Sequence, residues 1–477
     1  MTTSSISAAP AVPAVAPSMR WTLATLSLSM LLSSLGTSIA HVGLPTLATV
    51  FDATFQDVQW VVLAYLLAIT TLIVGVGRLG DLLGRRRLML AGLVLFTLAS
   101  TVCGLASELW QLVAARAAQG LGAAVMMALT LAFVADTVPK DKAGTAMGLL
   151  GTMSAVGTAM GPSLGGLLIA GFGWRSIFLF QLPLGLLALL LVYRYLPAVG
   201  QAPKKAAARF DTKGMLLLAL ALAAYALAMT LGRGDFGLRN LALIVAAGVG
   251  IALFLRVEAA AASPLIQLSM FRNPVLGAGF ATSALVATVV MATLVVGPFY
   301  LSLALLLDPA RVGLVMASGP VVAAIAGMPS GRAVDRFGAP RMATAGLLAM
   351  LAGTSILPML PMRLGVAGYL VPLVVITAGY AVFQAANNTA VMAGGPAEQR
   401  GVLSGMLGLS RNLGLITGAS VMGAVFAFGS ATVNVVSARP EAVATGMRTT
   451  FAVAAAIIVV ALGVAAAGRA QSAGANV

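Results

Sequence analysis

The chain has 477 residues, of which 60% are hydrophobic and only 9% are charged, and its mean hydropathy is +1.02. A soluble domain carries about a quarter charged residues, so this composition excludes a water-soluble globular protein. The net charge of +15 would suggest nucleic acid in a soluble protein. Here the Lys and Arg residues lie between apolar runs and set membrane orientation, so we expect the lipid bilayer as partner and no nucleic acid.

The residues that bind metals and nucleotides are nearly absent. The chain has one cysteine, Cys103, and one histidine, His41, which excludes an intrachain disulfide and a protein-built metal site. It has no Gly-x-x-x-x-Gly-Lys-Ser/Thr motif for ATP. No nucleophile, acid or metal constellation lies inside an apolar run. We therefore expect no metal, no cofactor and no enzymatic activity.

Apolar runs of about 20 residues recur along the chain, each long enough to cross roughly 30 Å of hydrocarbon. We predict an all-α polytopic membrane protein with fourteen spans, after an Ala-, Pro- and Ser-rich tail at residues 1–18 that is expected to be disordered. The predicted spans are 21–44, 58–77, 88–107, 110–135, 144–170, 177–196, 214–231, 241–257, 275–306, 312–333, 343–360, 365–393, 402–428 and 450–468.

The loops between these spans predict the orientation. With Met1 inside, the predicted inner loops and tails hold more than twice as many Lys and Arg residues as the outer loops. The positive-inside rule then places both termini in the cytoplasm. We expect the protein in the plasma (inner) membrane.

The chain contains an internal duplication. Residues 77–87 read GRLGDLLGRRR and residues 331–341 read GRAVDRFGAPR, sharing Gly, Arg, Asp, Gly and the last Arg at a constant offset. A second set of glycines also repeats at constant offset: Gly144, Gly148, Gly151, Gly157 and Gly161 match Gly401, Gly405, Gly408, Gly414 and Gly418.

The duplication predicts two six-helix bundles with two inserted helices between them, which is a common build of alternating-access carriers. The expected divisions are the tail 1–18, a bundle 19–196, a link with two inserted helices 197–272, a bundle 273–470 and a short tail 471–477.

Five motifs in order resemble the major facilitator superfamily, and more narrowly its fourteen-span drug:proton antiporter branch. Residues 77–87 resemble the signature loop between the second and third helices. Other matches lie in the second, fourth, fifth and sixth helices: Trp60, Tyr65, Arg116, Gln119, Gly120, Gly122, Gly157, Gly161, Pro162, Gly165, Gly166, Trp174, Arg175, Pro183 and Gly185. The resemblance implies a transporter that binds a small-molecule substrate and exchanges it for protons.

The signature loop is expected to form a conformational latch. Its glycines permit a tight turn between two helix ends, and its charges can form a network at the cytoplasmic rim that breaks in one state. The latch residues are predicted to be Gly77, Arg78, Asp81, Gly84, Arg85, Asp136, Asp335 and Arg336. In the simpler interpretation, the charges only terminate helices and set topology.

The fifth predicted helix carries small residues on one face. Gly157, Gly161 and Gly165 are spaced for close packing against a neighbouring helix, and Pro162, next to Gly161, removes a backbone hydrogen bond and bends the helix. Gly166 completes the motif that the resemblance assigns to antiporters. Ordinary membrane packing explains the spacing alone equally well.

The first predicted helix departs from the family pattern. Gly36 stands where the branch has an acidic residue, and His41 where it has Asn. All thirteen Asp and Glu residues lie in loops or at helix ends.

Arg116 remains inside its span, where burial costs roughly 2.5–3.5 kcal/mol. The expected cavity residues of this half are His41, Trp60, Tyr65, Arg116 and Gln119, and they favour neutral or anionic substrates. His41 is open to three roles: proton carrier, substrate contact or structural hydrogen-bonding group.

The second half carries a polar patch in a late span. Gln384, Asn387 and Asn388 fall on one helix face, and Tyr380 extends that face by one turn. Amides in hydrocarbon are costly unless they are paired or wet, so we expect these residues to line the cavity. The alternative is that they bind a neighbouring helix.

The sequence therefore predicts a monomeric secondary transporter that exports hydrophobic, drug-like molecules by alternating access with proton coupling. The alternative is an exporter of one neutral or anionic metabolite with atypical or no proton coupling. A more remote alternative is a non-transporting membrane receptor, although no segment is long enough for a soluble signalling domain.

Overall fold

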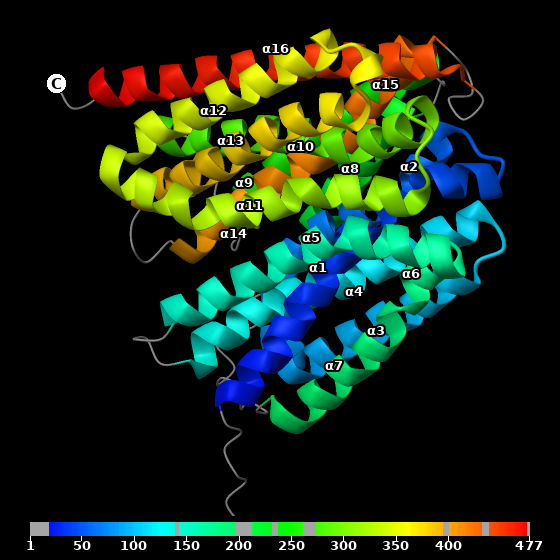
Figure 1. The fold of residues 1–477 in the computed structure, drawn as a ribbon. Helices are drawn as coiled ribbons and strands as arrows, with labels where there is room; N and C mark the ends of the chain where they lie inside the picture. Colours follow the sequence, from blue (N-terminus) through cyan, green and yellow to red (C-terminus); the bar gives the residue numbers. More distant parts are fainter. Residues whose placement is uncertain are drawn as a thin grey trace, which may run out of the picture.

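The computed structural model describes residues 19–138, 143–196, 212–230, 237–260, 273–394, 400–431 and 438–474, and the elements in these ranges are helices (Figure 1). The predicted N-terminal tail, residues 1–18, lies outside the described residues, as do residues 197–211 of the predicted link. The predicted C-terminal tail at 471–477 begins inside the last helix, which runs to Gly474.

The first helices are α1 (Met19–Val50), α2 (Phe55–Leu83), α3 (Arg85–Leu105), α4 (Leu109–Thr137), α5 (Ala143–Phe172), α6 (Ser176–Leu179) and α7 (Gln181–Tyr195). Two helices follow, α8 (Thr212–Thr230) and α9 (Leu238–Ala260). The remainder are α10 (Pro274–Phe299), η2 (Tyr300–Ala304), α11 (Pro309–Phe337), α12 (Ala339–Ile356), η3 (Leu357–Met359), η4 (Met362–Leu364), α13 (Gly365–Ala393), α14 (Arg400–Thr417), η6 (Gly418–Met422), α15 (Gly423–Gly429) and α16 (Pro440–Gly474).

The all-helical membrane class is confirmed. Within the described residues, twelve helical segments are long and apolar enough to cross a membrane, and two shorter apolar stretches, Val156–Phe172 and Lys213–Ala228, lie in α5 and α8. Each predicted span has a helical counterpart, although the last helix begins ten residues earlier than predicted, at Pro440. The figure of fourteen spans stays a prediction.

The two copies of the duplicated loop adopt the same turn. Gly84 ends α2 with φ of 88°, and Gly338 ends α11 with φ of 86°. Each donates its backbone N–H back into the preceding helix, to Gly80 at 2.9 Å and to Val334 at 2.8 Å. A side chain is strained at such φ values, so the sequence needs glycine at both positions. The tight turn predicted at Gly84 is present.

The helices form two groups that lie beside each other (Figure 1). In the first group α5 packs on α1, while α4 packs on α2 and α3. In the second group α12 packs on α13, and α10 packs on α14 and α16. Helix α8 packs on α9 and on α2, and Tyr225 of α8 interacts with Thr417 at the end of α14.

The glycines of α5 bring three helices close together. A Cβ atom at Gly157 would lie 2.6 Å from the Leu31 carbonyl oxygen, and one at Gly165 would lie 2.8 Å from Val42, so this face packs on α1. A Cβ at Gly166 would lie 3.0 Å from Gly313 of α11, in the other group. The small-residue face therefore packs α5 within its own group and also joins the two groups.

A second contact joins the groups at the same end of the molecule. Phe55, at the start of α2, packs against Phe299 and Phe426, with ring centroids 4.6 Å and 5.1 Å away. One turn further on, Gln59 Nε2 donates to the carbonyl oxygen of Ala419 in η6 at 3.1 Å. Gly423 makes room for this amide, because a Cβ there would overlap it. We call this end, opposite the Gly84 and Gly338 turns, the closed end.

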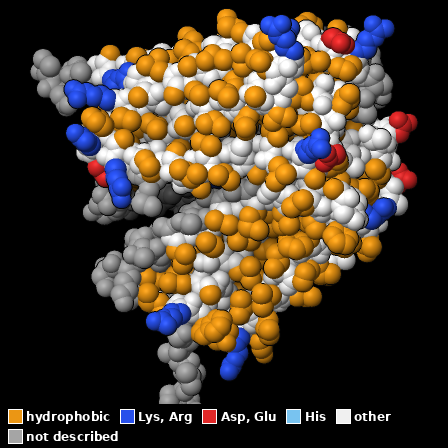
Figure 2. Space-filling model, viewed as in Figure 1, with side chains coloured by type: hydrophobic (Ala, Val, Ile, Leu, Met, Phe, Trp, Pro, Cys, Tyr) orange, Lys and Arg blue, Asp and Glu red, His pale blue; other side chains and the backbone are white. Residues whose placement is uncertain are grey.

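The groups diverge towards the end that carries the Gly84 and Gly338 turns. In the space-filling view a cleft enters between them from this side, and hydrophobic side chains cover much of the outer surface between the two ends (Figure 2). Charged side chains gather mainly at the two ends (Figure 2). This distribution matches a belt of lipid around the molecule.

Replacement of Gly313 by Leu is expected to open the closed end. The new side chain would meet the Pro162 carbonyl and Gly166 across the seam, and overpacking of this kind costs about 1–3 kcal/mol. Cys103 is buried, so a Phe299→Cys variant places one reactive thiol at the seam. We expect Gly313→Leu to increase maleimide labelling of that thiol in purified protein.

The matched control is Gly327→Leu on the same helix, where a Cβ has no neighbour within 4 Å. This control should label like the parent. Equal labelling of the Gly313→Leu protein and the control would contradict the proposed role of the glycine contact.

Candidate functional site

Arg116 lies at the centre of a hydrogen-bonded cluster in the first group of helices. Its side chain is completely buried in α4. Nε donates to the Val61 carbonyl of α2 at 2.9 Å, and Nη1 donates to the Gly36 carbonyl of α1 at 3.0 Å. Nη1 also donates to Gln119 Oε1 at 2.6 Å, while Nη2 has no hydrogen-bond partner. Carbonyl and amide oxygens thus bind this guanidinium.

The Tyr65 ring and two further polar side chains, Ser100 and Gln181, complete the cluster. The guanidinium carbon lies 4.1 Å from the Tyr65 ring centroid, and the Tyr65 hydroxyl donates to the Ser33 carbonyl at 2.9 Å. Gln119 Nε2 donates to Ser100 Oγ at 2.7 Å and to Gln181 Oε1 at 3.2 Å. The cluster therefore joins α1, α2, α3, α4 and α7.

Gly36 stands where the family resemblance expects an acid, and the packing explains the glycine. A Cβ atom there would lie 2.8 Å from the Tyr65 hydroxyl and 3.3 Å from the Phe96 ring. A carboxylate at this position would displace the Tyr65 ring that covers Arg116. The Gly36 carbonyl takes the place of the missing acceptor.

His41 lies one to two turns further along α1 and is also enclosed, with 1% of its surface exposed. Its Nδ1 lies 3.2 Å from the Ser38 carbonyl, and its Nε2 has no hydrogen-bond partner. The ring is close enough to Arg116 for the two to interact electrostatically. An enclosed imidazole with one unused nitrogen can hold a proton or accept a hydrogen bond.

The predicted residues of this half are thus together, but they are buried within the helix group. Tyr65, Arg116 and Gln119 are each fully buried, and Trp60 is half-buried on α2. In this conformation the cluster holds helices together and does not line the cleft.

The predicted patch of the other half separates into two environments. Asn387 is buried and donates to the Gly279 carbonyl of α10 at 3.1 Å. It therefore binds a neighbouring helix, which was the alternative to lining the cavity. Asn388 is exposed, and Tyr380 and Gln384 are half-buried. Tyr380 interacts with Arg411 of α14 through a side-chain contact that the sequence did not predict.

The latch residues are only partly visible. The side chains of Gly77, Arg78, Asp81 and Asp136 lie outside the described residues. Gly84 forms the turn described above, and Arg85 is half-buried beside it. In the second copy Asp335 and Arg336 are exposed at the end of α11, and Arg336 lies 5.3 Å from the Phe337 ring centroid. The latch stays a prediction.

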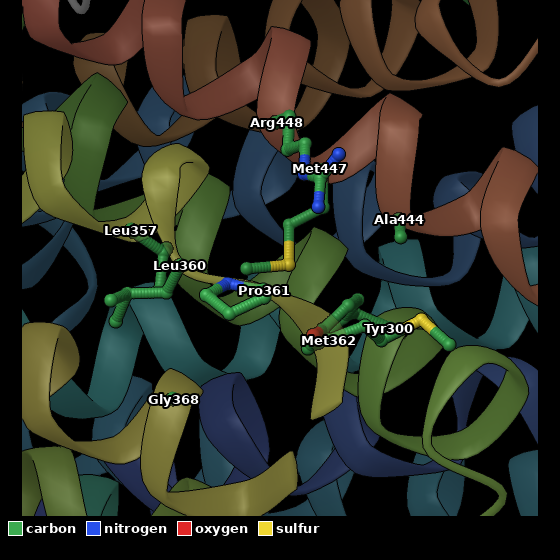
Figure 3. A pocket seen from close by; sticks show the side chains of 9 residues that line it. All are labelled: Tyr300, Leu357, Leu360, Pro361, Met362, Gly368, Ala444, Met447 and Arg448. Atoms are coloured by element: carbon green, nitrogen blue, oxygen red, sulfur yellow. The ribbon is translucent and has the colours of Figure 1, made fainter. Parts of the chain in front are cut away.

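Two pockets lie within the second group of helices. One, of about 300 Å³ including its opening, lies near the closed end, and Tyr300, Met362, Met447 and Arg448 are among the side chains that line it (Figure 3). The other, of about 610 Å³ including its opening, lies at the opposite end of α10 and α13, where Asn387 and Arg469 contribute polar groups. Arg469 is already bonded there to Thr344 at 2.7 Å.

A sequence profile of the Major Facilitator Superfamily matches residues 26–419 and 308–473 of this chain. The chain belongs to the major facilitator superfamily. The superfamily resemblance is therefore confirmed, and the protein is a membrane transporter and not an enzyme.

Two relatives show what kinds of transporter this member of the superfamily is similar to. The multidrug resistance protein Stp of Mycobacterium tuberculosis is 35% identical over 410 residues, which cover 85% of this chain and 75% of Stp. The riboflavin transporter RibZ of Clostridioides difficile is 30% identical over 406 residues, which cover 85% of this chain and 88% of RibZ.

The superfamily fold is also found in solved structures. A bacterial homologue of the human lysosomal transporter Spinster, solved in an inward-facing and unoccupied conformation, aligns with a TM-score of 0.69 and 16% identity. The alignment covers 94% of this chain and 97% of the other. At this identity the comparison shows the shared fold alone.

Sequence reasoning missed the residues that connect helices through backbone oxygens. The carbonyl acceptors at Gly36 and Val61 leave no mark in a side-chain pattern, and neither does the acceptor at Ala419. Gln59, Ser100 and Gln181 did leave a signal, because each is a polar residue within or beside an apolar run. Such residues must find partners in the membrane.

Replacement of Gly36 by Ala is expected to destabilise the cluster around Arg116. The added methyl group would lie 2.8 Å from the Tyr65 hydroxyl, and we expect a loss of about 1–3 kcal/mol and a lower Tm in thermal unfolding of the purified protein. In a Tyr65→Phe background the hydroxyl is gone, so the same substitution should lower Tm by less.

Gly171→Ala is the control, since a Cβ at that position of α5 has no neighbour within 4 Å. It should leave Tm unchanged. If the loss at position 36 is the same in the Tyr65 and Phe backgrounds, the steric account of Gly36 is wrong.

Proposed function

We propose that the protein exports hydrophobic small molecules by alternating access of the cleft between the two groups of helices. The observation that carries this proposal is the similarity over 85% of the chain to a relative named for multidrug resistance. The contacts at the closed end and the cleft at the other end support one state of such a cycle. Proton entry is the proposed driving force.

The proposed topology has fourteen spans, as six plus two plus six, with both termini in the cytoplasm of a plasma-membrane protein. The bundles would be residues 19–196 and 273–470, and α8 and α9 the inserted pair. The bias of Lys and Arg towards the loops at the Gly84 and Gly338 turns supports this orientation. The cleft would then open to the cytoplasm, where an exporter collects its substrate. Charges at the signature loop would latch the opposite state.

The second candidate function is export of one neutral or anionic metabolite with atypical or no proton coupling. Two observations favour it. Gly36 leaves the first helix without a carboxylate, and a relative of similar coverage is named a riboflavin transporter. The two candidates differ in the breadth of their substrates and in their response to a pH gradient.

Transport by purified protein in liposomes separates these candidates. We expect an acidic interior to accelerate uptake of several unrelated hydrophobic drugs, because outward proton flow then drives drug entry through inside-out molecules. A protonophore should abolish the acceleration, and protein-free liposomes give the passive rate.

Uptake of riboflavin or another single compound, at a rate that the gradient does not change, would instead support the second candidate. If no compound of the panel enters faster than in protein-free liposomes, the protein transports none of these compounds, and the result contradicts both candidate functions for them.

His41 is the proposed proton carrier of the first function, because an imidazole can bind and release a proton and the Nε2 of His41 has no hydrogen-bond partner. His41→Ala should remove the effect of the pH gradient on drug uptake while drug exchange without a gradient continues. His41→Gln keeps a hydrogen-bonding side chain that does not titrate. If His41 only supports structure, Gln should restore gradient-driven uptake, and that result would exclude it as the carrier.

A further inference from the structure

Arg411 lies on α14, about a third of the way along the helical segment from Arg400 to Gly429. This helix packs closely on α10, since Thr288 Oγ1 donates to the Gly414 carbonyl at 3.1 Å and a Cβ at Gly414 would lie 2.8 Å from Ala287. Arg411 is one turn before Gly414, on a similar side of the helix. Its side chain is half-buried, so part of it remains accessible.

The Arg411 side chain extends from α14 to α13. There it interacts with the Tyr380 hydroxyl, while its own Nε is buried and has no hydrogen-bond partner. A guanidinium has five N–H donors, and one tyrosine oxygen satisfies few of them. Arg411 therefore retains hydrogen-bonding capacity at a depth where the helix is surrounded by apolar residues.

The face of α13 that carries Tyr380 leads towards the open end of the cleft. Gly379 and Phe383 pack on α12 through Gly346, so that side of α13 is covered. Tyr380, Gln384 and Asn388 are spaced four apart and share another face. Their exposure increases along it, from half-buried Tyr380 and Gln384 to exposed Asn388. The result is a polar stripe on α13 that runs from Asn388 to Tyr380, beside Arg411.

Arg411 is the charged side chain beside this face of α13. In the described part of the chain no Asp or Glu forms a salt bridge with it, and every Asp and Glu of the sequence lies in a loop or near a helix end. Arg116, which also lies within a span, is enclosed and bound by two backbone carbonyls and Gln119. An accessible guanidinium with unused donors binds a carboxylate through charge-assisted hydrogen bonds.

We propose that Arg411 and Tyr380, with Gln384 one turn further along α13, form an anion-binding subsite of the transport path. Its ligand is the carboxylate of an amphipathic organic acid, whose apolar body lies against the aliphatic lining of the cleft. The inference rests on the proposed transport function, and it narrows the substrate class to organic anions. Tyr380 and Gln384 donate the remaining hydrogen bonds to the carboxylate oxygens.

Arg448 is the competing cation in the second group. It lines the 300 Å³ pocket near the closed end, beside Tyr300 and the methionines of that pocket (Figure 3). That pocket lies near the closed end, and Arg411, Tyr380 and Gln384 are not among the residues that line it. Its substitution therefore gives a matched control for the general loss of one positive charge.

The test is equilibrium binding to purified protein without a gradient, with pairs of probes that differ only in charge. 1-Naphthaleneacetate and its neutral amide are one such pair, and 2-naphthoate with 2-naphthamide is another. We expect the anion of each pair to bind more tightly than its amide. Arg411→Gln should reduce anion affinity about tenfold or more and leave amide affinity unchanged, since one charge-assisted interaction is lost.

Three further variants keep the result interpretable. Arg411→Lys should retain part of the preference for the anion, and Tyr380→Phe should reduce it without removing a charge. Arg448→Gln should behave like the parent protein. If Arg411→Gln fails to fold, as judged by its unfolding temperature, Tyr380→Phe and Gln384→Leu carry the test, each with an expected loss of anion preference.

The proposal is overturned if the anions bind no more tightly than their amides, or if Arg448→Gln and not Arg411→Gln removes the preference. This outcome is distinct from failure of the proposed function. Efflux of neutral drugs with no anion preference would contradict the subsite alone. Anion preference at Arg411 without transport of any probe would contradict the exporter alone.

Discussion

A guanidinium enclosed by apolar helices is the constraint on which the first group of helices depends. Removing a charge from water is unfavourable unless hydrogen bonds compensate it, and Arg116 has no accessible surface. Its compensation comes from carbonyls of α1 and α2, and Gln119 extends the bonding to α3 and α7. Separation of any of these helices would strand the charge. The cluster therefore holds these five helices together.

The seam between the two groups is built differently. Its contacts are backbone packing at Gly166 and Gly313, the Phe55 aromatic cluster and the hydrogen bond from Gln59 to a backbone carbonyl. None of these contacts leaves a buried charge when it breaks, and neutral hydrogen bonds contribute only about 0.5–1.5 kcal/mol net. A rigid group beside a separable seam is the combination that rigid-body rocking requires.

The sequence predicted those features of the fold that follow from patterns of residue type. Apolar runs located the helices, and the repeated glycines located Gly84 and Gly338, whose positive φ values other residues tolerate poorly. It did not predict the acceptors of Arg116, because every residue carries a carbonyl and only the fold selects Gly36 and Val61. For the same reason Asn387 and Asn388, adjacent in sequence, were assigned one role although one bonds to α10 and the other is exposed.

The absence of a side chain at Gly36 has two linked effects. It makes room for the Tyr65 hydroxyl, and it directs a backbone carbonyl to the position where the family resemblance implies a titratable carboxylate. A carbonyl dipole stabilises Arg116 at every pH, so this contact does not change when a proton arrives. The proposed proton carrier beside Arg116 is therefore His41, whose Nε2 is unbonded. Arg116 is enclosed and so cannot distinguish charged substrates in this conformation, and the half-buried Arg411 of α14 is the cation on which we propose that this selection depends.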